Sequence, residues 1–153
     1  MSKKKHKQPN KGQVIIPAGH PNPPDSYEFD VAMILACHYQ TTVEFLVPVD
    51  DYKRKTADIT MLGVEWEIKC PTGNSKSTIG NQLRWAAKQA NHIVIDTRHT
   101  KLQYEGIEKK VQFEVNSKAS IKKAILINLN SRIFSIHVGR KRSTITKAMK
   151  YRE

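Results

Sequence analysis

The sequence has few cysteines and no long hydrophobic run. Cys37 and Cys70 are its two cysteines, and they are not spaced as a CxxC pair. A disulfide framework or a zinc knuckle is therefore not expected, and we predict two buried thiols in a reducing compartment. No apolar run reaches the roughly 20 residues of a membrane-spanning helix, and the run Val14–Ile16 ends at Pro17, too early for a signal peptide. We expect a cytoplasmic protein without a membrane partner, while delivery into other cells stays open.

Acidic residues are scarce beside basic ones. The chain has 14 Asp and Glu against 26 Lys and Arg, and its formal net charge is +12. Residues 1–12 and 140–153 each carry a net +5. Cationic ends of this kind attract nucleic-acid phosphates, although ends that merely keep a protein in solution have the same composition. We predict a basic flexible N-terminal tail (1–16), one folded domain (17–139) and a basic C-terminal tail (140–153).

The spacing of apolar residues predicts a single α/β domain with a mixed β-sheet flanked by helices. The expected elements, in chain order, are a helix from Asp25 or Ser26 to about Gln40, strands over Thr42–Pro48, Ala57–Leu62 and Val64–Cys70, a helix over Ser77–Ala90, a strand over His92–Thr97, and a terminal hairpin of Lys123–Leu129 and Arg132–Val138. The strand His92–Thr97 is almost entirely apolar, which indicates a buried, parallel strand. Residues 101–123 fit either a broken helix or an added strand.

Two carboxylates and one amine are expected to meet in the hairpin formed by the second and third strands. Alternation along the third strand puts Glu67 and Lys69 on one face, and pairing of the strands can bring Asp58 next to Glu67. Carboxylates this close repel each other unless a proton or a cation joins them, and their oxygens suit Mg²⁺ or Mn²⁺. Such a metal can activate a water against a phosphate, while Lys69 orients the water or stabilises the developing charge. The alternative is a solvated strand face.

The same residues resemble the signature of a nuclease superfamily. Asp58-x8-Glu67-Ile68-Lys69, between a leading helix and a Gln-bearing helix, is similar to the motif of the PD-(D/E)XK nucleases, whose core has the order helix, three strands, helix, strand. The block ADITMLGVEWEIKCPTGNSKSTIGNQLRWAAKQANHIVIDTR (57–98) is similar to the tRNA-nuclease toxin domain at the C-terminus of contact-dependent inhibition proteins (CdiA). The resemblance implies a PD-(D/E)XK nuclease-like fold and a growth-inhibitory toxin. That toxin would act as a metal-dependent endonuclease, with tRNA as the expected substrate.

The resemblance also implies roles for individual residues. Asp58, Glu67 and Lys69 match the catalytic positions of the motif. Asp58 and Glu67, together with Glu28 on the first helix, are the implied ligands of Mg²⁺ or Mn²⁺. Glu28 equally fits a capping box with Asp25, in which it would serve the helix alone.

Further candidates follow from the chemistry of single residues. His20 can act as a general acid or base, because the unperturbed pKa of histidine is close to neutrality. Gln82 and Gln89, seven residues apart, are expected on one helical face, from which they contact the scissile phosphate or hold Lys69 in place. The expected nucleic-acid contacts are polar and basic residues of the same loop and helix: Ser75, Lys76, Ser77, Arg84 and Lys88. Ordinary helix capping and exposed helix residues are the alternatives.

Three side chains outside the motif also have expected places. Trp66 and Trp85 occupy positions that suit the hydrophobic core, so we do not assign them to base stacking. Asp96 ends its strand, where it either lies near the active edge or caps a turn.

Three other functions fit these residues. A metal-independent ribonuclease of the barnase, EndoU, colicin or RelE kind would let the 2′-OH of RNA attack, with His20, Glu67, Lys69 and Thr78 handling the protons. A non-catalytic nucleic-acid-binding module would rely on the basic ends. A DNase of the restriction-endonuclease type shares the core motif. An immunity protein is a candidate partner, and the tRNA species, the metal and the oligomeric state are left open.

Overall fold

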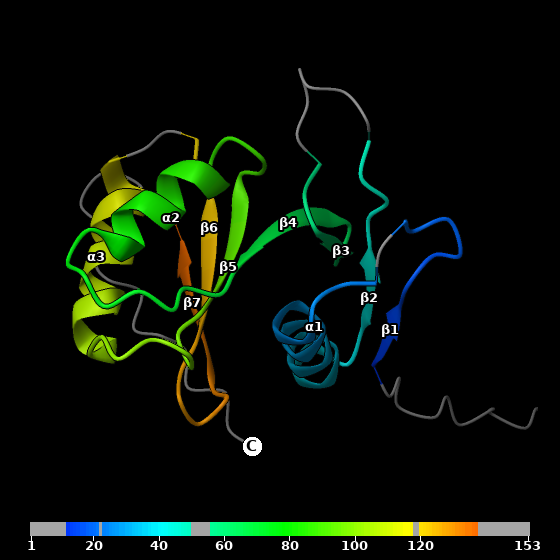
Figure 1. Ribbon diagram of the computed structural model, residues 1–153, viewed down its shortest axis with the longest axis horizontal. Helices are drawn as coiled ribbons and strands as arrows, with labels where there is room; N and C mark the ends of the chain where they lie inside the picture. Colours follow the sequence, from blue (N-terminus) through cyan, green and yellow to red (C-terminus); the bar gives the residue numbers. More distant parts are fainter. Residues whose placement is uncertain (1–11, 22, 50–55, 118–119, 138–153) are drawn as a thin grey trace, which may run out of the picture.

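Seven strands form one mixed sheet, and their order across the sheet is their order along the chain (Figure 1). The computed structural model describes residues 12–21, 23–49, 56–117 and 120–137. The strands are β1 (Gln13–Ile15), β2 (Thr42–Phe45), β3 (Ile59–Met61), β4 (Val64–Lys69), β5 (His92–Asp96), β6 (Lys123–Ile127) and β7 (Ile133–His137). The helices of the described ranges are α1 (Ser26–Tyr39), α2 (Thr78–Ala86) and α3 (Tyr104–Ser117). The chain is therefore an α/β domain built on a curled, mixed sheet.

The pairing of the strands brings three strand ends to one edge of the sheet. β1 is parallel to β2, β2 to β4 form an antiparallel meander, β4 to β6 are parallel, and β7 returns antiparallel to β6. In this register Lys69 pairs with Ile95, and Asp96 pairs with Ile127. The carboxyl ends of β4, β5 and β6 therefore lie side by side, and we call this the carboxyl edge. Ligands of open α/β sheets commonly bind at such an edge.

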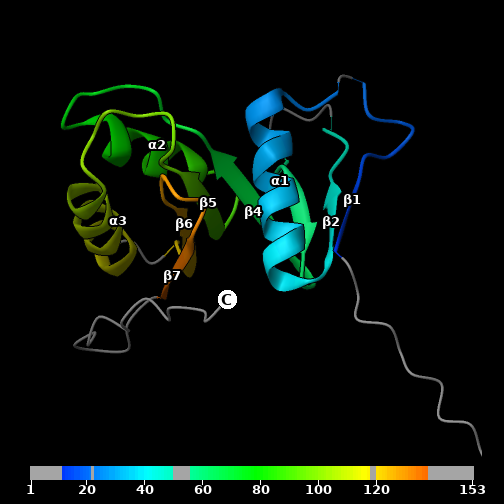
Figure 2. The same cartoon turned by 90° about the horizontal axis from the view of Figure 1, so that it is seen from below.

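The helices cover both faces of the sheet. Leu35 of α1 belongs to a buried cluster on one face, and Leu83 of α2 and Val111 of α3 belong to a second cluster on the other face. Along β5, Val94 joins the first cluster and Ile95 the second, which is the alternation expected of a strand buried on both sides. Figure 2 shows α1 apart from α2 and α3, with β4 running between them. Within the described ranges, no helix combines the length and the apolar character needed to cross a membrane.

Helix α1 is capped at both ends by its own sequence. Asp25 is the N-cap, and its Oδ1 accepts a hydrogen bond from the backbone N–H of Glu28 at 2.8 Å. Gln40 ends the helix with a φ of 49°, a left-handed conformation that is common at helix ends. The buried stripe has helical spacing and consists of Val31, Ala32, Leu35 and Ala36. The caps therefore fix the first turn of α1, which carries Glu28.

The structure resolves or corrects several predicted elements. β1 lies inside the segment predicted as a flexible tail (1–16); the prediction missed it because three residues, of which only Val14 is half-buried, are too few for a periodic pattern. α2 ends at Ala86, earlier than predicted, and α3 is one continuous helix rather than a broken helix or an added strand. The parallel pairing of β5 and the terminal hairpin of β6 and β7 are confirmed. The basic ends, 1–11 and 138–153, lie outside the described residues.

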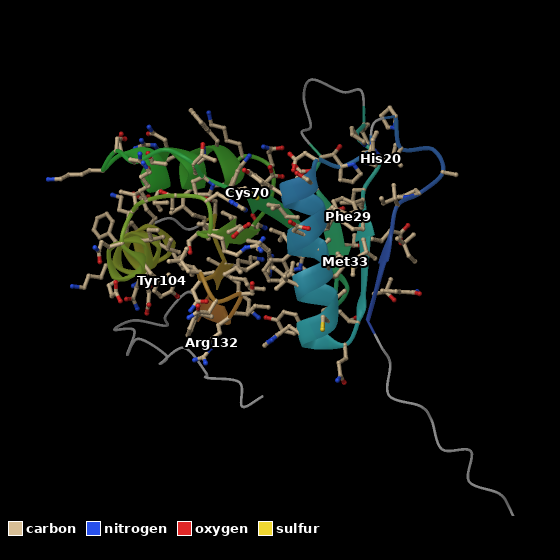
Figure 3. The ribbon with its side chains drawn as sticks, turned by 60° about the horizontal axis from the view of Figure 1, so that its bottom comes forward. His20, Phe29, Met33, Cys70, Tyr104 and Arg132 are labelled. Atoms are coloured by element: carbon tan, nitrogen blue, oxygen red, sulfur yellow. The ribbon has the colours of Figure 1, made fainter. Side chains whose placement is uncertain are left out.

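The prediction of two buried thiols is wrong for Cys37. Cys37 is exposed on α1, because it lies one helical turn after Met33, outside the buried stripe of that helix. Met33 marks this exposed side of α1 in Figure 3. Cys70 is half-buried just after β4. Both cysteines are free thiols, as predicted.

The two tryptophans differ in burial. Trp66 is 2% exposed, and its indole N–H donates a hydrogen bond to the carbonyl of Met61 at 3.2 Å. Trp85 is 55% exposed, so its predicted core position is wrong. α2 turns Leu83 and Ala86 toward the sheet instead, and Trp85 lies between them on the outer side.

Candidate active site

Asp58, Glu67 and Lys69 meet at one end of the β3–β4 hairpin. The backbone N–H of Asp58 donates to the carbonyl of Trp66 at 3.0 Å, which extends the ladder beyond β3 and sets Asp58 beside Glu67. Asp58 Oδ2 accepts a hydrogen bond from the backbone N–H of Ile68 at 2.7 Å. Lys69 Nζ lies 2.9 Å from Glu67 Oε1. The structure thus brings together the three side chains that the strand pattern predicts.

Glu67 is buried, so a solvated strand face does not describe this hairpin. The residue is 3% exposed, whereas a charge on an open strand face would lie in water. Its Oε2 atom is buried and has no hydrogen-bond partner among the described residues. A buried carboxylate oxygen without a partner is destabilising, and such atoms commonly mark a place where a ligand or an ion binds.

Burial and mutual repulsion raise the pKa values of three carboxyl groups. Burial is the largest cause for Glu67, whose pKa rises to about 7, and the charge of Asp58 adds to the rise while Lys69 opposes it. Burial also raises the pKa of Asp58, against the backbone hydrogen bond from β4 and the charge of Lys69. The pKa of Glu28 rises to about 7 through burial first and then through the charge of Asp58. A cation among these groups would relieve the repulsion.

His20 and Glu28 line the same cavity as Asp58. This cavity has a volume of about 240 Å³, and its wall also includes Asp25 and prolines of the lead-in to α1. His20 Nδ1 is buried and has no hydrogen-bond partner among the described residues. The structure therefore places two further predicted site residues in one cavity with Asp58.

The carboxylates offer two ligands rather than a complete metal site. In the part of the chain that the structure describes, no group of three or more His, Cys, Asp or Glu side chains is arranged to hold a metal ion. Mg²⁺ usually binds through one or two carboxylates and takes its other ligands from water and phosphate. The pair Asp58 and Glu67 fits that chemistry, and the unpartnered Oε2 of Glu67 is an available ligand.

The predicted pairing of Gln82 and Gln89 on one helical face is wrong. α2 ends at Ala86, so Gln89 lies in the turn that follows, while Gln82 is half-buried in the helix. Lys88 and Gln89 line a cavity with residues at the start of β4, whereas Lys69 ends that strand. A strand of this length separates its two ends by about 16 Å. Lys88 and Gln89 are therefore at the edge of the sheet opposite to the carboxylate pair.

The loop before α2 bonds to itself rather than capping the helix. Ser77 is the N-cap residue, but its side chain makes no capping hydrogen bond. Ser75 Oγ lies 3.0 Å from Ser77 Oγ and 3.1 Å from Thr78 Oγ1. Lys76 lines a mainly apolar cavity between α2 and α3, and Arg84 is exposed and hydrogen-bonded to a neighbouring asparagine. Among the described residues, no hydrogen bond or ion pair joins these side chains to the carboxylate pair.

A second polar cluster at the carboxyl edge escaped the sequence analysis. Asp96 is fully buried and accepts hydrogen bonds from Arg98 Nε at 2.8 Å and from Arg98 Nη2 at 2.9 Å. His99 Nε2 lies 3.5 Å from Asp96 Oδ2, the oxygen that also accepts from Arg98 Nη2. The His99 ring stacks on Tyr27 of α1, with ring centroids 3.9 Å apart and an angle of 6° between the planes. Asp96 ends β5 and accepts the backbone N–H of Arg98 at 3.1 Å, which is the turn-capping alternative; its place near an active edge stays a prediction.

The family and the fold were compared with known proteins. The sequence model of the contact-dependent growth inhibition CdiA C-terminal domain matches residues 55–133. The structure resembles a solved CdiA-CT/CdiI toxin and immunity complex from Burkholderia pseudomallei, with a TM-score of 0.54 and 14% sequence identity over 82% of this chain and 99% of that chain. At this identity the likeness concerns the fold alone. Comparison with curated protein sequences gives no match. Because the family match spans more than half of the 153 residues, the chain belongs to the contact-dependent growth inhibition CdiA C-terminal domain family.

Proposed function

We propose that this growth-inhibitory toxin domain is an endonuclease that hydrolyses phosphodiester bonds with a divalent metal ion, and that its substrate is tRNA. The proposal is carried by one observation: Glu67 is buried, the half-buried Asp58 lies beside it, and Lys69 Nζ lies 2.9 Å from Glu67 Oε1. Buried carboxylates destabilise a fold unless a bound partner compensates them. A module that binds nucleic acid through basic ends has no need of such a pair. A PD-(D/E)XK nuclease-like arrangement of the elements around the pair is part of the proposal.

The side chains around the pair divide the chemistry among them. Asp58 and Glu67 would hold Mg²⁺ or Mn²⁺. When bound, that ion would supply a water of lowered pKa and offset the charge of the phosphate. Lys69 keeps Glu67 in place and has ammonium protons left to donate to a phosphate oxygen. Glu28 and His20 line the adjacent cavity. Glu28, with its pKa of about 7, can accept or return a proton there near neutral pH.

A metal-independent ribonuclease is the second candidate. It is favoured by the pKa values of about 7 at Glu28 and Glu67, which suit proton transfer at neutral pH without a metal. In that mechanism the 2′-OH of RNA attacks the neighbouring phosphate and the product ends in a 2′,3′-cyclic phosphate. Chelation separates the two candidates, because only the hydrolytic mechanism depends on the ion.

The decisive experiment incubates the purified protein with tRNA, total RNA and plasmid DNA, in Mg²⁺ and in EDTA. We expect cleavage of tRNA in Mg²⁺ and no cleavage in EDTA. In Lys69→Ala the cleavage rate should fall by about 100-fold or more. Lys122→Gln is the matched control, because Lys122 is an exposed lysine at the start of β6, away from the carboxyl edge. Cleavage that survives EDTA and leaves cyclic phosphates would replace the metal mechanism by the second candidate. Intact RNA and DNA under all conditions would refute the nuclease.

An immunity protein is the partner that we propose for this domain. The solved structure with a similar fold is a complex of a toxin with an immunity protein. A toxin that cleaves tRNA acts in the cytoplasm, where its producer also needs protection. Co-purification of this chain with such a partner would support the immunity protein. Loss of RNA cleavage in the complex would support its protective role.

A further inference from the structure

Arg98 lies at the carboxyl edge, just past the end of β5, the strand next to the one that carries Glu67 and Lys69. β4 and β5 are parallel neighbours, and Lys69 is paired with Ile95, one residue before the aspartate that holds Arg98. Adjacent strands are about 4.8 Å apart. Cys70, which follows Lys69, lies between α1 and the half of the molecule that carries α2 and α3 (Figure 3). Its thiol is close enough to Glu28 and Arg98 for both charges to act on its pKa. Arg98 and Glu28 thus both lie near Cys70, the residue that follows Lys69.

The guanidinium of Arg98 is fixed in direction but not fully used. Asp96 is completely buried and binds Arg98 through Nε and Nη2, which holds the planar group in one orientation. Nη1 has no hydrogen-bond partner among the described residues, and the side chain is 17% exposed. An arginine needed only to neutralise Asp96 would satisfy that role with these two contacts. The remaining N–H donors are therefore available to a ligand.

The stack of Tyr27 on His99 ties this cluster to the first turn of α1. Tyr27 precedes Glu28, and its ring lies flat on His99, which also faces Asp96. Asp30, on the same helix, is near enough to Arg98 for its charge to raise the pKa of the guanidinium further. The segments that carry the carboxylate pair, Glu28 and Arg98 are thus held against one another by direct contacts.

The charges at this edge leave a need for a further cation. The carboxylates of Asp58, Glu67 and Glu28 repel a phosphodiester, and the bound ion and Lys69 would act on the scissile phosphate itself. A neighbouring phosphate of the strand therefore needs a positive contact of its own. Arg98 has an N–H group that Asp96 does not use, and it follows the end of β5 beside the end of β4.

We propose that Arg98 binds a phosphate of the nucleic acid strand next to the scissile bond, and that Asp96 and the Tyr27–His99 stack act as positioning residues for it. The inference rests on the proposed function, since the ligand is the substrate of the nuclease. Arginine suits this role because its planar fork can bind a carboxylate and a phosphate at the same time.

The test measures binding of fluorescent tRNA by anisotropy in a Lys69→Ala background, across a series of salt concentrations at fixed Mg²⁺. Arg98→Gln is expected to weaken binding by about 10- to 100-fold. It should also reduce the slope of log affinity against log salt by about one unit, because one phosphate contact is lost. Arg98→Lys keeps the charge, so it should retain the salt slope while losing part of the affinity. Lys122→Gln, at the opposite edge, is the control for loss of one positive charge.

A second variant guards against unfolding. Arg98→Gln alone leaves the buried Asp96 without its cation, so Arg98→Gln combined with Asp96→Asn removes both charges together, and circular dichroism checks its fold. If this folded double variant binds with the affinity and salt slope of Lys122→Gln, the assignment of Arg98 is refuted, even where the parent enzyme cleaves RNA. The parent protein could also bind tRNA without cleaving any nucleic acid. If Arg98→Gln then still lowers the affinity and the salt slope, the proposed nuclease activity is refuted and the phosphate site at Arg98 is supported. Absence of binding in the parent refutes both.

Discussion

Glu67 combines burial, charge and an unpartnered oxygen in one residue. Its pKa in the folded protein, about 7, lies above the ordinary glutamate value of 4.5, chiefly because burial penalises the charged form. A raised pKa means that the folded state holds the proton more tightly than the unfolded chain. The associated stability is fully present below pH 4.5 and is lost as the pH rises through about 7. At neutral pH and above, the ionised Glu67 therefore destabilises the protein that it serves.

Replacing Glu67 by glutamine should consequently stabilise the metal-free protein at alkaline pH. Urea unfolding in EDTA at pH 8 should give a free energy of unfolding up to about 3 kcal/mol higher for Glu67→Gln than for the parent. The difference should shrink toward zero at pH 4.5, where Glu67 is protonated in the folded protein. A variant that is equally destabilised at both pH values would show that the carboxylate is structural and that its charge carries no penalty.

Part of the candidate site can be predicted from sequence because it is local. Asp58, Glu67 and Lys69 belong to one hairpin, and strand alternation brings them together without knowledge of the rest of the fold. The Arg98 cluster joins α1 to the end of β5, and no periodic pattern encodes that contact. The seven-residue spacing of Gln82 and Gln89 misled because the helix stops between them.

At the scale of elements, a strong apolar pattern predicts that a helix or strand exists, and which of the two it is, better than it predicts where the element begins and ends. α1 and the β6–β7 hairpin have clear apolar periodicity and capping or turn residues, and both appear as predicted. β1 is too short for a pattern to develop, and it exists because β2 offers a free edge. α2 closes early through tight turns after Ala86, where the N–H of Gln89 bonds back to that residue. Contacts between distant parts of the chain determine whether β1 forms and where α2 ends. The spacing of residues in the sequence does not predict those contacts.

The two tryptophans test which side of β4 and of α2 packs into the core. Trp66→Ala removes a ring from the cluster between α1 and the sheet and should lower the free energy of unfolding by about 3–5 kcal/mol. Trp85→Ala, on the outer side of α2, should change it by less than about 1 kcal/mol. Denaturant titrations followed by far-ultraviolet circular dichroism compare the two. Equal losses would mean that α2 packs with Trp85 inward.

At the scale of the whole molecule, residues from a helix and from several strands meet at the carboxyl edge of the sheet. α1 covers one face of the sheet and contributes Glu28, while the strands β4 and β5 end at the edge where the carboxylates and Arg98 lie. No single element contains the site. Binding there should therefore stabilise the entire fold and not one segment of it.

This coupling predicts a metal effect on thermal stability that is independent of any RNA assay. Adding Mg²⁺ or Mn²⁺ at pH 8 should raise the melting temperature of the parent protein by several degrees, because ligand binding to the folded state shifts unfolding. Asp58→Asn and Glu67→Gln should lose the shift, while Lys122→Gln should keep it. A parent protein with the same melting temperature in Mg²⁺ and EDTA would speak for the metal-independent mechanism.

β4 is the strand that the antiparallel meander and the parallel part of the sheet have in common, since it pairs with β3 on one side and with β5 on the other. During synthesis the ribosome releases Asp58, Glu67 and Lys69 before β5, so the hairpin that carries them at first lacks its parallel neighbour. A chain released before His92 would therefore lack the parallel part of the sheet together with the Asp96–Arg98 pair.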